Sequence, residues 1–302
     1  MKASWFRRAT QAVACAGALT LLAACGSGSV VSDLEPKRFL TVGDSFMDVG
    51  QAGGTRYTVN DGTNNWVQEL ASHYSQPVTA ASAGGFAYAQ GHARVAAADP
   101  AGAPSVTAQI DALLARTTLN ATDDVVIVNG GMHDIVAAYN ATGISEATTK
   151  TVRDAGKALA EQVRRLVNAG GKHVAVAGVP LLGNSPWGRG TGHEDAVNTL
   201  SIDFNTALLT NIVDLGTNVL YLDSAFFFDL MYDEPQNYQF DNGKEPVCTT
   251  PDASTCTPAT VVSPDYNRWL FADGVHFTPR ALQHFGSDRY GENAYHRFKN
   301  RW

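Results

Sequence analysis

Short apolar runs alternate with longer amphipathic segments along most of the chain. Each run is closed by turn residues, as is typical of buried strands. The predicted strands are Phe39–Gly43, Val78–Ser82, Asp124–Asn129, His173–Val179 and Val219–Leu222. The predicted helices between them are Trp66–Tyr74, Val106–Arg116, Ala147–Asn168 and Ala196–Leu215. This alternation predicts an α/β fold, in which helices cover both faces of a parallel sheet of about five strands.

Candidate functional residues follow two of these strands and also occur near the C-terminus. Ser45 lies two residues beyond Gly43, and His133 follows the glycine pair that closes the apolar run in "VVIVNGGMHDIV". Asp273 and His276 stand three residues apart, immediately before a helix that begins with a proline. Because ligands of open α/β sheets bind at the carboxyl ends of the strands, these side chains are expected to gather at one site.

The chemistry of these residue types suggests nucleophilic catalysis. A serine hydroxyl becomes a useful nucleophile when an imidazole accepts its proton, and a carboxylate next to that imidazole can orient it. Taken alone, a serine in such a turn is more often a helix cap, and a histidine after a strand is more often only structural. The segment is not the G-x-S-x-G turn of α/β-hydrolases, since Met47 stands where the second glycine would be.

Composition and charge narrow the class of protein. The chain has 302 residues, of which 44% are hydrophobic and 17% charged, enough for one large core. No repeat or linker divides it, so we expect a single domain over residues 39–302. The formal net charge is −7 and no basic cluster is present, which argues against a nucleic-acid partner.

The N-terminal segment has the pattern of an export signal. Basic residues precede a short apolar stretch that ends in "LLAAC", which resembles a bacterial lipobox. We expect residues 1–24 to be removed, Cys25 to be lipidated, and residues 25–38 to tether the folded body to a membrane. The alternatives are a plain secretory signal or a retained membrane anchor. The expected location is the bacterial cell envelope or the exterior.

Two further cysteines bracket a Thr-, Pro- and Ser-rich segment. In an oxidising compartment, Cys248 and Cys256 are expected to form a local disulfide. A metal site is the weaker interpretation, because two thiols without a nearby histidine or second cysteine pair fall short of the usual four zinc ligands. No H-E-x-x-H motif is present, and neither a metal nor a cofactor is expected.

Together these segments resemble the GDSL, or SGNH, hydrolase family. "FLTVGDSFMDVG" is similar to its first block, "GGFAYAQGHARV" to the second block of its secreted esterase and phospholipase branch, and "DGVHFT" to its D-x-x-H block. "GVPLLGNSPWG" and "YDEPQNYQFDNGKEPVC" also resemble segments of that branch. The resemblance extends from Phe39 to about Phe285, with the blocks in order.

The resemblance implies a three-layer, flavodoxin-like α/β/α fold and ester hydrolysis through an acyl-enzyme. It implies that Ser45 is the nucleophile, His276 the general base and then acid, and Asp273 the residue that orients His276. The family's oxyanion hole combines the N–H of the nucleophile, a glycine N–H and an asparagine side chain. Here these correspond to Ser45, to Gly91 in preference to Gly84 or Gly85, and to His133 in place of the asparagine.

Three functions are compatible with this sequence. The first is a carboxylester hydrolase of the esterase, lipase or phospholipase kind, acting on lipid or other small acyl esters. The second is the same chemistry applied to O-acetyl groups of polysaccharide, or acyl transfer to an alcohol. The third is an inactive lipoprotein that only binds. A complete set of Ser45, Asp273 and His276 favours an enzyme, because a binding protein needs no such combination.

Overall fold

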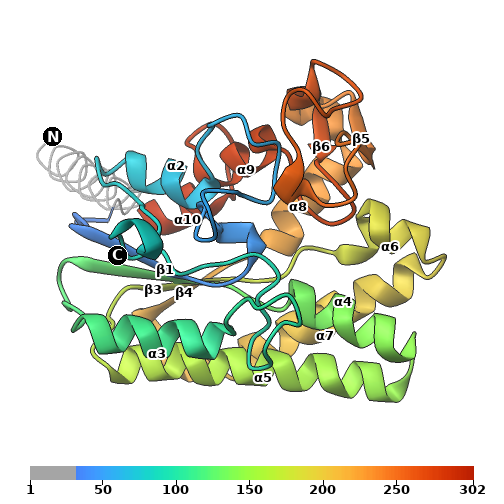
Figure 1. Cartoon of the computed structure of the whole chain (residues 1–302). Coiled ribbons are helices and arrows are strands. Elements are labelled where there is room, and N and C mark those ends of the chain that lie inside the picture. Colours follow the sequence, from blue (N-terminus) through green and yellow to red (C-terminus); the bar gives the residue numbers. More distant parts are fainter. Residues whose placement is uncertain (1–31) are drawn as a thin grey trace, which may run out of the picture.

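The central sheet consists of parallel strands that follow one another in chain order. The computed structural model describes residues 32–302. The strands are β1 (Arg38–Val42), β2 (Asp124–Val128), β3 (Val174–Ala177) and β4 (Val219–Leu222), arranged β1-β2-β3-β4. All neighbouring strands pair in parallel, so their carboxyl ends lie at the same end of the sheet (Figure 1). The predicted α/β class with a central parallel sheet is confirmed.

Helices cover both faces of the sheet, because alternate strand residues are apolar on opposite faces. In β1, Phe39 belongs to one core and Leu40 and Val42 to the other. The first face is covered by α2 (Trp66–Ser72), α8 (Ser224–Asp233), α9 (Pro279–Gly286) and α10 (Ala294–Lys299) (Figure 1). The second is covered by α3 (Val106–Arg116), α4 (Met132–Thr142), α5 (Glu146–Asn168) and α7 (Glu194–Thr210). The result is three layers.

The predicted helices correspond to α2, α3, α5 and α7, with shifts of a few residues at the ends. The predicted Pro-initiated helix is α9, in which Pro279 is the first residue and Thr278 caps the N-terminus. α5 and α7 pack closely because Gly156 has no side chain: a Cβ there would lie 2.5 Å from the carbonyl oxygen of Phe204.

Several smaller elements complete the fold. β5 (Asn242–Pro246) and β6 (Trp269–Phe271) form a separate two-stranded parallel sheet. The other short elements are η1 (Ser45–Met47), η2 (Ala81–Ala83), η3 (Leu182–Asn184), α6 (Pro186–Gly190), η4 (Val213–Asn218), η5 (Pro235–Tyr238), η6 (Ala253–Thr255) and η7 (Tyr266–Arg268). β5, β6 and the segment between them stand above α8 in Figure 1.

The predicted strand at Val78–Ser82 is not formed as such. Thr41 in β1 instead exchanges backbone hydrogen bonds with the segment around Ala87, through Phe86 and Tyr88. Ala87 in turn pairs with Ala80, so the sheet continues past β1 only as isolated bridges. The chain leaves extended geometry at Ala81 to form η2. The sheet therefore has four regular strands, where about five were expected.

The predicted signal, Cys25 and most of the predicted tether lie outside the described residues. The last part of the tether runs along the folded body, where the Ser32 N–H donates to the carbonyl of Lys299 and the Lys37 N–H to that of Asp123. Within residues 32–302, no helix is long and apolar enough to cross a membrane.

Candidate active site

The turn that carries Ser45 is rigidly held at the end of β1. The Asp44 carboxylate accepts a hydrogen bond from the Phe46 N–H at 3.0 Å, which caps η1. Asn129, at the end of β2, accepts from the Asp44 N–H at 3.0 Å and donates to its carboxylate at 2.5 Å. A Cβ on Gly43 would lie 1.7 Å from the Asn129 side-chain oxygen, so this close pairing requires glycine.

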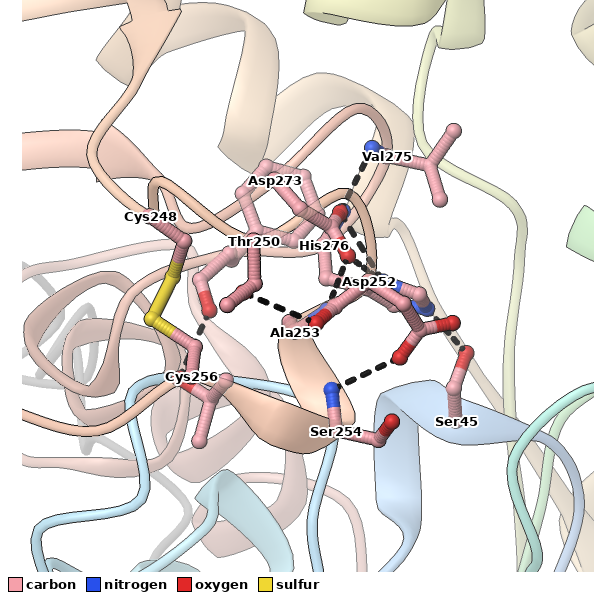
Figure 2. Close-up of polar contacts among 12 residues, drawn as sticks. Ser45, Cys248, Thr250, Asp252, Ala253, Ser254, Cys256, Asp273, Val275 and His276 are labelled. Carbon is pink, nitrogen blue, oxygen red and sulfur yellow. Dashed lines mark hydrogen bonds and ion pairs between the residues drawn. A yellow bond between two sulfur atoms is a disulfide. The ribbon is translucent and has the colours of Figure 1, made fainter. Parts of the chain in front are cut away.

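Asp273 and His276 lie between β6 and α9 and reach Ser45 from the opposite end of the chain (Figure 2). The Nε2 atom of His276 is 2.9 Å from Ser45 Oγ, and its Nδ1 is 2.8 Å and 2.9 Å from the two Asp273 oxygens. The Asp273 carboxylate also accepts from the backbone N–H groups of Val275, His276 and Ala253. Its position is therefore set by four donors.

The charges of this pair support each other. Burial alone would raise the pKa of Asp273, but the charge and hydrogen bonds of His276 lower that pKa to about 2. Burial alone would likewise lower the pKa of His276, but the charge and hydrogen bond of Asp273 outweigh it and raise that pKa. Near neutral pH, Asp273 is ionised and holds the Nδ1–H of His276. The Nε2 atom of neutral His276 is then free to accept the Ser45 proton.

His133 lies on the other side of Ser45, in the first turn of α4. Its Nε2 atom is 3.1 Å from Ser45 Oγ, and the side chain is buried. The helix begins after Gly131, whose φ of 112° and contact with the Phe204 ring leave no room for a Cβ. Burial, together with the nearby charges of His276 and His92, lowers the pKa of His133 well below its ordinary value. The ring is neutral at pH 7 and carries a single N–H.

Ser45 Oγ lies 2.9 Å from Nε2 of His276, 3.1 Å from Nε2 of His133 and 3.9 Å from the Met132 sulfur, which is only a weak acceptor. The two histidine contacts determine where the N–H of His133 lies. The hydroxyl has one proton, which it donates to Nε2 of His276 when Asp273 holds the Nδ1–H. Toward His133 the hydroxyl oxygen therefore accepts, so the proton of the neutral His133 ring is on Nε2. This arrangement places an N–H donor beside the hydroxyl oxygen of Ser45.

Gly91 has a different environment from the one expected. Its N–H donates to the Asp48 carboxylate at 2.8 Å. A Cβ on Gly91 would lie 1.7 Å from the ring of Tyr57, whose centroid is 5.2 Å from those of both His92 and His276. Within residues 32–302, the backbone N–H groups of Ser45 and His92 have no hydrogen-bond acceptor.

The predicted disulfide between Cys248 and Cys256 is present. It closes the loop that supplies the Ala253 N–H to Asp273 (Figure 2). The same loop carries Asp252, which caps η6 through the Ser254 N–H and contacts Nε2 of His92 at 3.1 Å. The disulfide loop is thus part of the wall of the site.

Several of these neighbours were not identified from the sequence. The contact between His92 and Asp252 could not be predicted, because the two residues are 160 positions apart in the sequence. Asn129 and Ala253 act through long-range hydrogen bonds that leave no local motif. A positive φ at His92, 63°, marks an unusual backbone, but the sequence alone does not reveal it.

An α/β sheet with a hydrogen-bonded serine, histidine and aspartate at the carboxyl ends of its strands has the geometry of a serine-hydrolase site. The chain belongs to the family described as GDSL-like Lipase/Acylhydrolase, which it matches over residues 39–288.

Proteins of Arabidopsis thaliana are among the relatives. The anther-specific proline-rich protein APG is 28% identical over 188 residues, which cover 56% of this chain and 35% of that protein. A GDSL esterase/lipase is 29% identical over 135 residues, covering 41% of this chain and 37% of that protein. The chain thus matches little more than a third of the length of these curated relatives.

Similar solved structures come from bacteria. An acetylxylan esterase mutant from Geobacillus stearothermophilus has 12% identity and a TM-score of 0.49, covering 84% of this chain and 93% of that chain. The extracellular lipase of Streptomyces rimosus has 15% identity and a TM-score of 0.45, covering 88% of this chain and 99% of that chain. Neither similarity bears on the substrate of this protein.

Proposed function

We infer that this protein hydrolyses acyl esters through an acyl-enzyme formed on Ser45. The observation that carries this proposal is the continuous hydrogen-bonded series from Asp273 through His276 to Ser45. In the acylation step, Ser45 Oγ attacks the ester carbonyl while His276 Nε2 takes the hydroxyl proton. The tetrahedral intermediate then collapses, the ester C–O bond breaks, and His276 returns the proton to the leaving alkoxide.

Deacylation repeats these steps with water. His276 accepts a proton from a water molecule, whose oxygen attacks the acyl carbonyl. The bond to Ser45 Oγ breaks, and the proton passes from His276 to the serine oxygen. Asp273 remains ionised and stabilises the imidazolium in both half-reactions.

The oxyanion is stabilised in this proposal by the Ser45 N–H and the His133 ring N–H. The Ser45 N–H has no acceptor among the described residues, and the His133 N–H lies beside the serine oxygen. Hydrogen-bond donors that are already in position before the reaction stabilise the negative charge that develops on the oxygen, because the protein does not have to rearrange around it. Gly91 can act as the third donor only if its N–H exchanges the Asp48 carboxylate for the substrate.

The proposed substrates are esters of lipids or other small acyl esters at the bacterial cell envelope. This part rests on the N-terminal sequence, in which cleavage after Ala24 and lipidation of Cys25 would hold residues 39–302 at a membrane surface. A single folded domain over that range is also part of the proposal.

A substrate panel tests the proposed function. Nitrophenyl esters of different chain length, phospholipids and acetylated glycans are offered to the wild type and to Ser45→Ala. We expect ester turnover by the wild type and a loss of several orders of magnitude in kcat for the variant, which should fold normally. Equal turnover by the two proteins would contradict the mechanism. Binding of an ester without any turnover by the wild type would support the binding-protein alternative.

A further inference from the structure

The backbone of His92 has a conformation that residues with a side chain rarely adopt. Its φ is 63°, in the left-handed region where a Cβ is unfavourable and glycine is free of strain. Such conformations persist when surrounding contacts hold them, and they concentrate at functional sites. The contacts of the His92 ring therefore indicate what its side chain contributes.

The His92 ring lies between Asp252 and His133. Its Nε2 is 3.1 Å from an Asp252 oxygen, and its centroid is 4.7 Å from that of His133 and 5.2 Å from that of Tyr57. Asp252 is fixed in turn, because its other oxygen accepts from the Ser254 N–H at 2.7 Å in the disulfide loop. The ring is thus anchored at one edge and packed against two aromatic neighbours.

The orientation of the His133 ring depends on a packed neighbour such as His92. Apart from the contact between its Nε2 and Ser45, no group within residues 32–302 hydrogen-bonds to the ring, so its Nδ1 is not anchored. Most catalytic histidines are oriented by a hydrogen bond at the second nitrogen, as Asp273 orients His276. For His133, packing has to supply the orientation, and the His92 ring is closer to it than the His276 ring, at 4.7 Å against 5.9 Å.

We propose that His92 and Asp252 form a positioning pair that holds the His133 ring with its Nε2–H beside Ser45 Oγ, where the oxyanion of the proposed reaction forms. This inference rests on the proposed function. The pair touches neither Ser45 nor His276 through a hydrogen bond and acts through His133. A donor that rotates out of line loses most of its value to the transition state, while the fold of the protein is unaffected.

A double-mutant cycle with 4-nitrophenyl acetate tests this proposal. His92→Gly removes the ring, keeps the backbone N–H and suits the positive φ, so the variant should fold at least as stably as the wild type. We expect its kcat to fall about 10- to 100-fold with little change in KM. In a His133→Ala background, the same substitution should change kcat by less than about twofold, because the ring that it positions is gone. Asp252→Asn keeps the η6 cap and removes the charge. Because that charge also helps to raise the pKa of His276, its kcat is compared on the pH plateau where His276 is neutral, and there its smaller effect should also vanish in the His133→Ala background.

The control is Ser75→Gly, which relieves an exposed positive φ of 56° outside the site and should leave kcat unchanged. An unchanged kcat for His92→Gly, or an equal loss in both backgrounds, would overturn the positioning role. If His92→Gly fails to fold, the Asp252→Asn cycle gives the same decision. Failure of the proposed function itself would be recognised separately, because Ser45→Ala would then turn over the ester as fast as the wild type.

Discussion

Removing the His133 ring should reduce turnover without unfolding the protein. The ring is neutral, 9% exposed, and its Nε2 lies 3.1 Å from Ser45 Oγ, so His133→Ala deletes one buried N–H donor at the reacting centre. Loss of one such donor costs about 10²–10³-fold in kcat, or roughly 2.7–4 kcal/mol of transition-state stabilisation. KM should change little, because the ground-state carbonyl makes weaker use of the donor.

His133→Asn provides the matched comparison. The asparagine amide is also an N–H donor, but its shorter side chain reaches less far, so we expect kcat between those of the wild type and His133→Ala. Steady-state kinetics and thermal unfolding are measured on the same three proteins. Because the wild-type ring is uncharged, neither substitution should remove a titrating step from the pH profile. Near-equal kcat values for His, Asn and Ala, or losses explained by a lower Tm, would refute the role of His133.

Three further outcomes follow from the site and the N-terminal sequence. The pKa of His276 is raised above 6.5, and His276 acts as a base only when it is neutral, so kcat/KM should rise with pH through a midpoint above 6.5. Asp273→Asn should move that midpoint to lower pH and lower kcat by about 10⁴-fold. An unmoved midpoint would contradict the electrostatic coupling between Asp273 and His276. Cys248→Ser should lower the free energy of unfolding by about 2–3 kcal/mol and also lower kcat through Ala253 and Asp273. Free thiols at both positions in the purified wild type would exclude the bridge. Cys25→Ser should release unlipidated protein from the membrane or block processing, whereas mass spectrometry showing an intact N-terminus in the wild type would refute lipidation.

The α/β fold could be predicted from the sequence because its signals are local, whereas the roles proposed for Ser45, Asp273 and His276 come from the family resemblance. Alternation of apolar runs marks the strands, and Asp273 and His276 are only three residues apart. The supporting residues could not be predicted, because Asp252 meets His92, and Ala253 meets Asp273, only after the chain has folded.

The predicted strand at Val78–Ser82 shows a second reason for failure. Its apolar pattern is short and rich in alanine, which has a weak preference for strands. Pairing with the segment around Ala87 leaves the predicted strand only an isolated bridge, and the chain turns into η2 directly afterwards.

The hydrogen bond from the Gly91 N–H to the Asp48 carboxylate could not be predicted either, because the two residues are 43 positions apart in the sequence.

Covalent labelling of Ser45 tests the central claim most directly. A serine-reactive organophosphonate forms a stable adduct only with an activated hydroxyl, so peptide mass spectrometry of the labelled protein identifies the nucleophile. The account predicts one adduct on Ser45, loss of esterase activity in proportion to labelling, and no adduct in His276→Ala. Labelling at another serine, or full esterase activity after Ser45 is modified, would contradict it.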